Sequence, residues 1–359
     1  MWSMKRWWVS RSQWGNREIS VQCGPTELGG RRSPHPFENT GRGISGLAKQ
    51  LSTSKNSLVV NNIPVTRRPR FQAYVYLVAA LFFLQAVLAL TPWYPTALGP
   101  LIFDVLLNIF VVMHMLTIYR GRDVVIFYVV TLVISNLYEN IGILTGFPFG
   151  SYDYTDALGP KVFLVPVLVG ASYVGAAYAS WVMALIVLRQ WRRPLSGWSV
   201  VTVPAFAALF MVMWDLTFDP NSSTVRQWWI WKDGGAYFGV PVTNFLGWYL
   251  TVFSFMLIFA WWMRGSRAQA DVSGVDAIGR RGTWLAGVAI YFAMGLVQVP
   301  TESIAGGTQV IDGSGQLWNV VALQQALGLV TLFTMGTVVA LALQAIGTAG
   351  GREPRTSRQ

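Results

Sequence analysis

The sequence predicts an all-α membrane protein, a polytopic bundle of about eight transmembrane helices. Three observations predict this class. Of the 359 residues, 53% are hydrophobic and only 12% are charged, which is too apolar for a soluble globular domain. Apolar runs of about 20 residues, the length that a helix needs to cross a bilayer, recur from Phe71 onward. The links between these runs alternate between many and few basic residues.

Residues 1–70 are expected to form a disordered, basic cytoplasmic tail. They are rich in Gly, Ser, Arg, Asn and Pro and lack the apolar segment of a signal peptide. They contain 12 Lys and Arg against 3 Asp and Glu, so most of the net charge of +11 lies here. Because these basic residues are scattered, we expect attraction to membrane lipid headgroups and no binding of nucleic acid.

Eight apolar runs follow the tail, and each has the length of one transmembrane helix. They lie at residues 71–90, 99–119, 123–144, 163–188, 199–217, 241–263, 283–299 and 320–346. Residues 71–346 are therefore expected to form the transmembrane domain, followed by a short basic cytoplasmic tail at 347–359. In the fourth run, Ala171, Gly175 and Ala179 are small residues at every fourth position, which predicts close helix packing and little direct function.

The basic residues of the links predict an orientation. One set of alternate links, together with the C-terminus, carries twelve: Arg120, Arg122, Arg189, Arg192, Arg193, Arg264, Arg267, Arg280, Arg281, Arg352, Arg355 and Arg358. The other set carries Lys161, Arg226 and Lys232. The positive-inside rule then places both termini in the cytoplasm, in a multi-pass protein of the cell (cytoplasmic) membrane.

Most acidic residues fall on the opposite, outer side of this topology. They are Asp104, Glu139, Asp153, Asp156, Asp215, Asp219, Asp233, Glu302 and Asp312. Several amides at the outer helix ends follow the same pattern, so we expect one pocket in the outer leaflet to gather many of these groups. His114, in the inner half, is expected to be a helix contact and not a ligand.

Residues 211–250 combine acids and aromatic residues within apolar runs. Asp215 and Asp219 lie in a helix that Pro220 is expected to stop, and Asn244 lies one turn inside the next helix. A carboxyl group in a membrane helix is costly and therefore indicates function. The alternative is that Asp215 bonds a neighbouring helix and that Trp228, Trp229 and Trp231 form an interfacial belt.

A weak internal repeat accompanies these acids. Pro166 follows Glu139 by 27 residues and Pro241 follows Asp215 by 26, with an aromatic, Gly-rich loop in each interval. This spacing predicts two parallel copies of a helix, acid, loop, helix unit.

Metal chemistry is not expected. The chain has one cysteine, Cys23, and two histidines, His35 and His114, which cannot supply the ligand clusters of zinc or non-haem iron sites. No cofactor motif is present, so any reaction is expected to need no cofactor.

Carboxyl groups in an apolar pocket suit general acid catalysis on a lipophilic molecule. Burial disfavours the carboxylate anion, so one acid can keep a proton and donate it to a double bond. Indole rings can stabilise the resulting tertiary cation, and a second carboxylate can accept a proton from water. The product is a hydrated alkene, or a cyclised or isomerised one if no water adds. Different classes of function are a proton-coupled transporter and a pigment-binding protein.

The residue chemistry suggests roles for the acids. Asp215, beside Met211, Trp214 and Phe218, is expected to be the proton donor. Glu139, flanked by the amides of Asn136 and Asn140, is expected to orient or deprotonate water. Asp219 is a third candidate and is expected to be more exposed to water, and Asn244 is expected to position water or substrate.

Two segments carry a family resemblance: ENIGILTGFPFGSYDYT from Glu139 and DLTFDPNSSTVRQWWIWKDGGAYFGVPVTNFLGW from Asp215. They resemble the integral-membrane carotenoid biosynthesis family of the CruF type, which includes carotenoid 1',2'-hydratases and the bisanhydrobacterioruberin hydratase. The resemblance covers roughly residues 75–346 and implies cofactor-independent hydration of the terminal C1'=C2' double bond of an acyclic carotenoid. The expected partners are this carotenoid, membrane lipid and other carotenoid biosynthesis enzymes.

Together these interpretations make residues 71–346 a transmembrane catalytic domain. The expected catalytic residues are Asp215, Glu139 and Asp219. The expected substrate-binding residues are Asn244, Trp229, Trp231, Tyr152, Tyr154, Trp214, Asn140 and Trp248.

Overall fold

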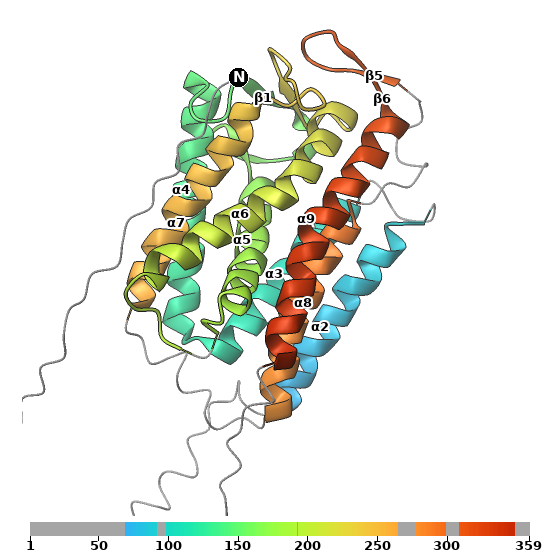
Figure 1. Cartoon of the computed structure of the whole chain (residues 1–359). Helices are drawn as coiled ribbons and strands as arrows, with labels where there is room; N and C mark the ends of the chain where they lie inside the picture. The colour runs from blue at the N-terminus through green and yellow to red at the C-terminus, as the bar shows by residue number, and fades with distance from the viewer. Residues whose placement is uncertain (1–68, 92–97, 192, 265–276, 299–308, 349–359) are drawn as a thin grey trace, which may run out of the picture. The chain divides into compact units, whose positions relative to one another are not determined.

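The structure is a computed structural model, and it describes residues 69–91, 98–191, 193–264, 277–298 and 309–348 (Figure 1). The predicted N-terminal tail lies almost entirely outside the described residues, as do Cys23, His35, Glu302 and most of the C-terminal tail.

Eight long helices make up most of the described chain, and they confirm the predicted all-α bundle. They are α2 (Pro69–Leu88), α3 (Gly99–Ile118), α4 (Gly121–Thr145), α5 (Val167–Val187), α6 (Ser199–Asp219), α7 (Val242–Met263), α8 (Ala277–Leu296) and α9 (Val320–Thr348). Each coincides with one predicted apolar run. Seven of the described helices are long and apolar enough to cross a bilayer, so the chain is a membrane protein.

Helix α8 is the exception among the eight. It was predicted as a transmembrane segment, but it is not among the seven helices that are apolar enough to cross. The reason lies in its first turns, where Arg280 and Arg281 lower its hydropathy. Its 20 residues measure about 30 Å at 1.5 Å per residue, and it packs along α2, α5 and α9 as the eighth member of the bundle (Figure 1).

Helix α5 lies at the centre of the bundle. Residues 173–186 of this helix are buried without a break, and α5 contacts α3, α4, α6, α8 and α9. A methyl group at Gly175 would overlap the side chain of Leu107 on α3, so the small residues of α5 do permit close packing, as predicted. Ser172 and Tyr173 on the same helix donate to buried carboxyl groups.

His114 ties three helices together. Its Nδ1 lies 2.6 Å from the hydroxyl of Tyr178 on α5, and its Nε2 lies 2.8 Å from the carbonyl oxygen of Thr283 on α8. A carbonyl can only accept, so Nε2 donates and Nδ1 accepts the tyrosine proton. The prediction of a helix contact is confirmed.

The short strands form three antiparallel pairs. They are β1 (Tyr152–Tyr154) with β4 (Trp229–Trp231), β2 (Lys161–Val162) with β3 (Val165–Pro166), and β5 (Gln309–Ile311) with β6 (Leu317–Asn319). Strand β1 lies at the same end of the bundle as the β5–β6 hairpin (Figure 1). Gln227, just before β4, donates to the carbonyl of Ile311 at 3.3 Å, which joins two of the three pairs.

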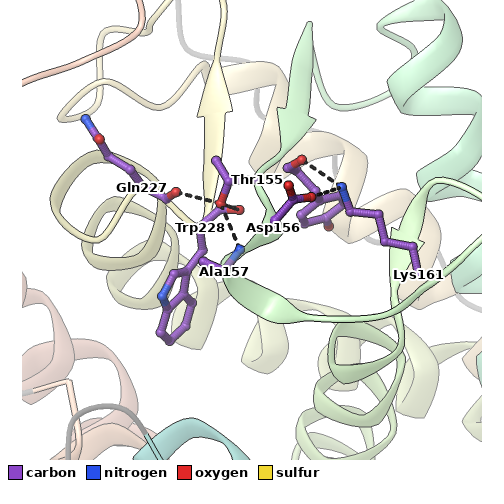
Figure 2. Close-up of polar contacts among 7 residues, drawn as sticks. Thr155, Asp156, Ala157, Lys161, Gln227 and Trp228 are labelled. Carbon is purple, nitrogen blue, oxygen red and sulfur yellow. Dashed lines mark hydrogen bonds and ion pairs between the residues drawn. The ribbon is translucent and has the colours of Figure 1, made fainter.

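The two loops that contain β1 and β4 are fastened to each other beyond the strands. Figure 2 shows Thr155 at the centre of this contact, where its hydroxyl donates to the carbonyl oxygens of Gln227 and Trp228 at 3.0 Å each. Its backbone N–H donates to Trp228 at the same distance. On the other side, Lys161 donates to the carbonyl oxygen of Tyr154 at 3.0 Å. These bonds fasten the strand pair at its Tyr154–Trp229 end, and at the other end the backbone N–H of Lys232 donates to the carbonyl oxygen of Ser151 at 2.9 Å.

Pro220 does not stop α6, contrary to the prediction. The helix continues through Pro220–Val225 as a π-helical turn. Side chains stabilise this turn from within, because Ser223 Oγ donates to the carbonyl of Asp219 at 2.9 Å and Asn221 Nδ2 donates to that of Thr217 at 3.2 Å. Asp219 consequently lies inside a longer helical segment and not at a wet helix end.

Candidate functional site

Glu139 lies near the C-terminal end of α4 and accepts hydrogen bonds from three tyrosine hydroxyls. Tyr173 on α5 donates to Oε1 at 2.7 Å, Tyr154 donates to Oε2 at 2.9 Å, and Tyr152 donates to the same oxygen. The side chain is only 3% exposed. Hydrogen bonds to a charged group contribute roughly 1.5–3 kcal/mol each, so this arrangement suits a buried carboxylate anion.

The backbone after α4 explains how Tyr152 and Tyr154 reach Glu139. Helix α4 ends at Gly146, whose φ of 77° lets the chain turn back toward the helix. Phe149 then inserts between α4 and α7, where a methyl group at Gly142 or Gly247 would overlap its ring. In the strand that follows, alternate residues share one face, so both tyrosines point inward while Asp153 pairs outside with Lys232 at 2.8 Å.

Asp219 has an equivalent set of donors from the second loop. The indole nitrogens of Trp229 and Trp231 donate to Oδ1 at 3.0 and 3.1 Å, and Nδ2 of Asn244 donates to Oδ2 at 2.6 Å. Trp229 and Trp231 are both buried. This favours the interpretation of the two tryptophans as part of a site over that of an interfacial belt.

Asp215 lies one helical turn before Asp219 and has fewer partners. Asn244 Nδ2 donates to its Oδ2 at 3.1 Å, so this single amide bridges the two acids. The other oxygen, Oδ1, is buried and has no hydrogen-bond partner among the described residues. Both acids are buried, since Asp215 is 0% exposed and Asp219 is 1% exposed, so neither lies at an exposed helix end.

Strands β1 and β4 bring the hydrogen-bond donors of Glu139 next to those of Asp219. Tyr152 pairs with Trp231 and Tyr154 pairs with Trp229, and the ring centroids are 4.8 and 5.8 Å apart. Burial raises the pKa values of the Tyr152 and Tyr154 hydroxyls well above the usual value, and the nearby Glu139 carboxylate raises both pKa values further. Both tyrosines therefore remain neutral hydrogen-bond donors at any physiological pH.

One cavity opens among these groups. It is lined by Glu139 and Asp219 together with the predicted substrate-binding residues Asn244, Trp229, Trp231, Tyr152, Tyr154, Trp214 and Trp248. Its volume is about 120 Å³, roughly ten times the space that one water needs, so it has room for a small apolar group and water. Trp214 stacks on Phe218 at 4.3 Å and Trp248 on Tyr173 at 4.5 Å, which gives the cavity aromatic walls.

Two predicted site residues do not line this cavity. Asp215 is not among the lining residues, whereas Asn244, which donates to it, is. Asn140 turns away, donating to the backbone and side-chain oxygens of Asn136 at 2.7 and 2.9 Å and accepting from the backbone N–H of Leu164 at 3.1 Å. The tyrosines, and not the amides that flank Glu139 in the sequence, donate to its carboxyl group.

Tyr173 was not predicted as a site residue, and Asp104 was predicted only as one acid among several. Asp104 on α3 also lines the cavity and accepts from Ser172 at 3.0 and 2.9 Å. A signal for Tyr173 was present in the proposed repeat. Tyr173 follows Pro166 by seven residues and Trp248 follows Pro241 by seven, and these two rings stack in the structure.

The pattern of hydrogen-bond donors also fits the proposed repeat, except that Asp219 takes the place that was assigned to Asp215. Pro166 and Pro241 precede the first residues of α5 and α7. Glu139 and Asp219 each receive two donors from the strand that follows their own helix. The residue that corresponds in role to Glu139 is thus Asp219 and not Asp215.

The comparisons with known proteins agree with this region of the chain. A profile described as carotenoid biosynthesis protein matches residues 100–297, which is more than half of the chain and includes Glu139, Asp215, Asp219 and Asn244. No curated protein and no solved structure gives a significant match. The chain belongs to the carotenoid biosynthesis protein family.

Proposed function

We propose that the protein hydrates the terminal C1'=C2' double bond of an acyclic carotenoid and gives a tertiary 1'-hydroxyl. The observation that carries the proposal is a cavity inside an apolar bundle that is lined by the carboxyl groups of Glu139, Asp219 and Asp104 and walled by aromatic rings. The family indicates a role in carotenoid biosynthesis, and the chemistry of the cavity supports the choice of hydration.

The two aspartates act as the acid in this proposal. Asp215 and Asp219 share one amide donor and lie in an apolar interior, where two neighbouring anions repel strongly. The pair therefore retains one proton. Because Asp219 lines the cavity and Asp215 does not, the direct donor role predicted for Asp215 passes to Asp219, and Asp215 keeps the shared proton available.

Glu139 acts as the base. Asp219 transfers its proton to C2', whose π electrons form the new C–H bond and leave a tertiary cation at C1'. A water molecule then forms the C–O bond at C1', and Glu139 accepts one proton from it. The reaction adds one water in total, and the proton on Glu139 returns to the aspartate pair through water in the cavity. Trp214 and Trp248 line the cavity, and we propose that their indole rings stabilise the cation.

We expect that producing the protein in cells that make an acyclic carotenoid yields a pigment heavier by one water per modified end. Mass spectrometry and chromatography of the extracted pigments measure this change. A product of unchanged mass with a shortened chromophore would show cyclisation instead. Unchanged pigment combined with solute flux would show transport.

We also propose that the site faces the outer leaflet of the cytoplasmic membrane, because the links on its side carry only three basic residues. A reporter fused after Arg352 should then be cytoplasmic, and one inserted near Ser222 should be external. Reporter activity in whole cells measures both positions. The reverse pattern would place the site on the cytoplasmic side.

A further inference from the structure

A second hollow lies on the outside of the bundle, between α4 and the start of α5. It has a volume of about 1000 Å³ and is lined mainly by apolar side chains. We call it the lateral groove. Its walls include Leu132, Val133 and Leu137 of α4, Phe163 of the β2–β3 turn, and Val169 of α5.

The lateral groove meets the catalytic cavity. Glu139 and Val169 line both hollows, and Tyr173, which donates to Glu139, lines the groove. The apolar outer surface and the reacting carboxylate are therefore separated by the width of a few side chains only. An apolar molecule in the groove can place one end beside Glu139.

The β2–β3 turn forms one rim of the groove, and its construction is unusual. Phe163 is 84% exposed and has a φ of 57°, a conformation that costs energy for a residue with a side chain. Asn140 holds this turn in place by accepting from the backbone N–H of Leu164 at 3.1 Å. Asn140, predicted to bind substrate, thus supports and lines the groove and not the catalytic cavity.

We propose that the lateral groove binds the polyene chain of the carotenoid, while the terminal double bond of the same molecule enters the catalytic cavity past Val169. This inference rests on the proposed function. The cavity has room for an end group and water but not for a long stiff chain, so the rest of the molecule must leave it. The groove offers an apolar exit that opens to the bilayer, from which a lipophilic substrate arrives.

Filling the groove tests the proposal. Val133 lines the groove and is 59% exposed, while Val129, one turn earlier on α4, is 50% exposed and does not line it. Val133→Trp should reduce the carotenoid that copurifies per protein severalfold, measured by visible absorbance, and Val129→Trp should retain the wild-type amount. Val169→Trp, at the junction, should reduce retention as well.

The retained pigment is measured whether or not it is hydrated, so this test is separate from that of the reaction. If the wild type retains unmodified pigment and Val133→Trp loses it, the groove is supported although hydration fails. Equal retention by Val133→Trp and Val129→Trp at equal membrane levels would overturn the proposal. So would a loss of bound phospholipid, with pigment unchanged, in Val133→Trp, because the groove would then be a lipid site.

Discussion

Asp219→Asn is expected to reduce hydration of the carotenoid by on the order of a hundredfold or more, because it removes the group that transfers the proton. Asparagine retains the size of the side chain but cannot supply an acidic proton. It also places an NH2 group among the N–H donors of Trp229, Trp231 and Asn244. Product formed per unit of membrane protein measures the effect.

Two further variants show whether the loss is chemical. Asp233→Asn changes an exposed acid of the same loop and should behave as the wild type. Asp215→Asn should cause a smaller loss than Asp219→Asn, since Asp215 does not line the cavity. If Asp215→Asn abolished the product while Asp219→Asn retained it, Asp215 would be the direct donor, as the sequence alone predicts. Retention of pigment by Asp219→Asn would show that the cavity still forms.

The helices and the importance of the acids could be predicted because they depend on local composition. A run of about 20 apolar residues forms a membrane helix largely irrespective of its neighbours. A carboxyl group within such a run is costly wherever it lies. These two rules identify the eight helices and single out Glu139, Asp215 and Asp219.

The partners of the acids could not be predicted in the same way, because they depend on contacts between distant segments. Asp215 and Asp219 lie on adjoining turns of one helix, so their spacing does not show which of them meets a cavity. The contact of Asn244 on α7 with both aspartates is likewise set by how the helices pack. The amides of Asn136 and Asn140 are close to Glu139 in sequence, yet tyrosines from β1 and α5 reach it instead.

The different surroundings of the acids give a physical basis for two roles in one cavity. Glu139 has three neutral hydroxyl donors, which stabilise an anion. Asp219 also has three N–H donors, but it lies beside Asp215, whose Oδ1 has no partner among the described residues. Two neighbouring anions repel each other, so the pair of aspartates keeps one proton. Groups whose surroundings favour opposite protonation states are the usual arrangement of an acid and a base.

Glu139→Gln is therefore expected to cause the second large effect, a loss of hydration on the order of a hundredfold or more, because an amide cannot accept the proton of the attacking water. Retained pigment should stay near the wild-type amount, since the tyrosine hydroxyls can also bond an amide. Both quantities come from the same membrane preparations, by chromatography and by absorbance.

Variants of the tyrosines show whether Glu139 acts as the base or only supports the structure of the site. Tyr154→Phe or Tyr173→Phe removes one of the three donors and leaves the carboxylate in place, so each should lower the rate less than Glu139→Gln does. Asp153→Asn lies between Tyr152 and Tyr154 but on the exposed face of β1, and it should leave the rate unchanged. If Glu139→Gln hydrated at the wild-type rate while Tyr154→Phe did not, the proton of water would pass to a group other than Glu139.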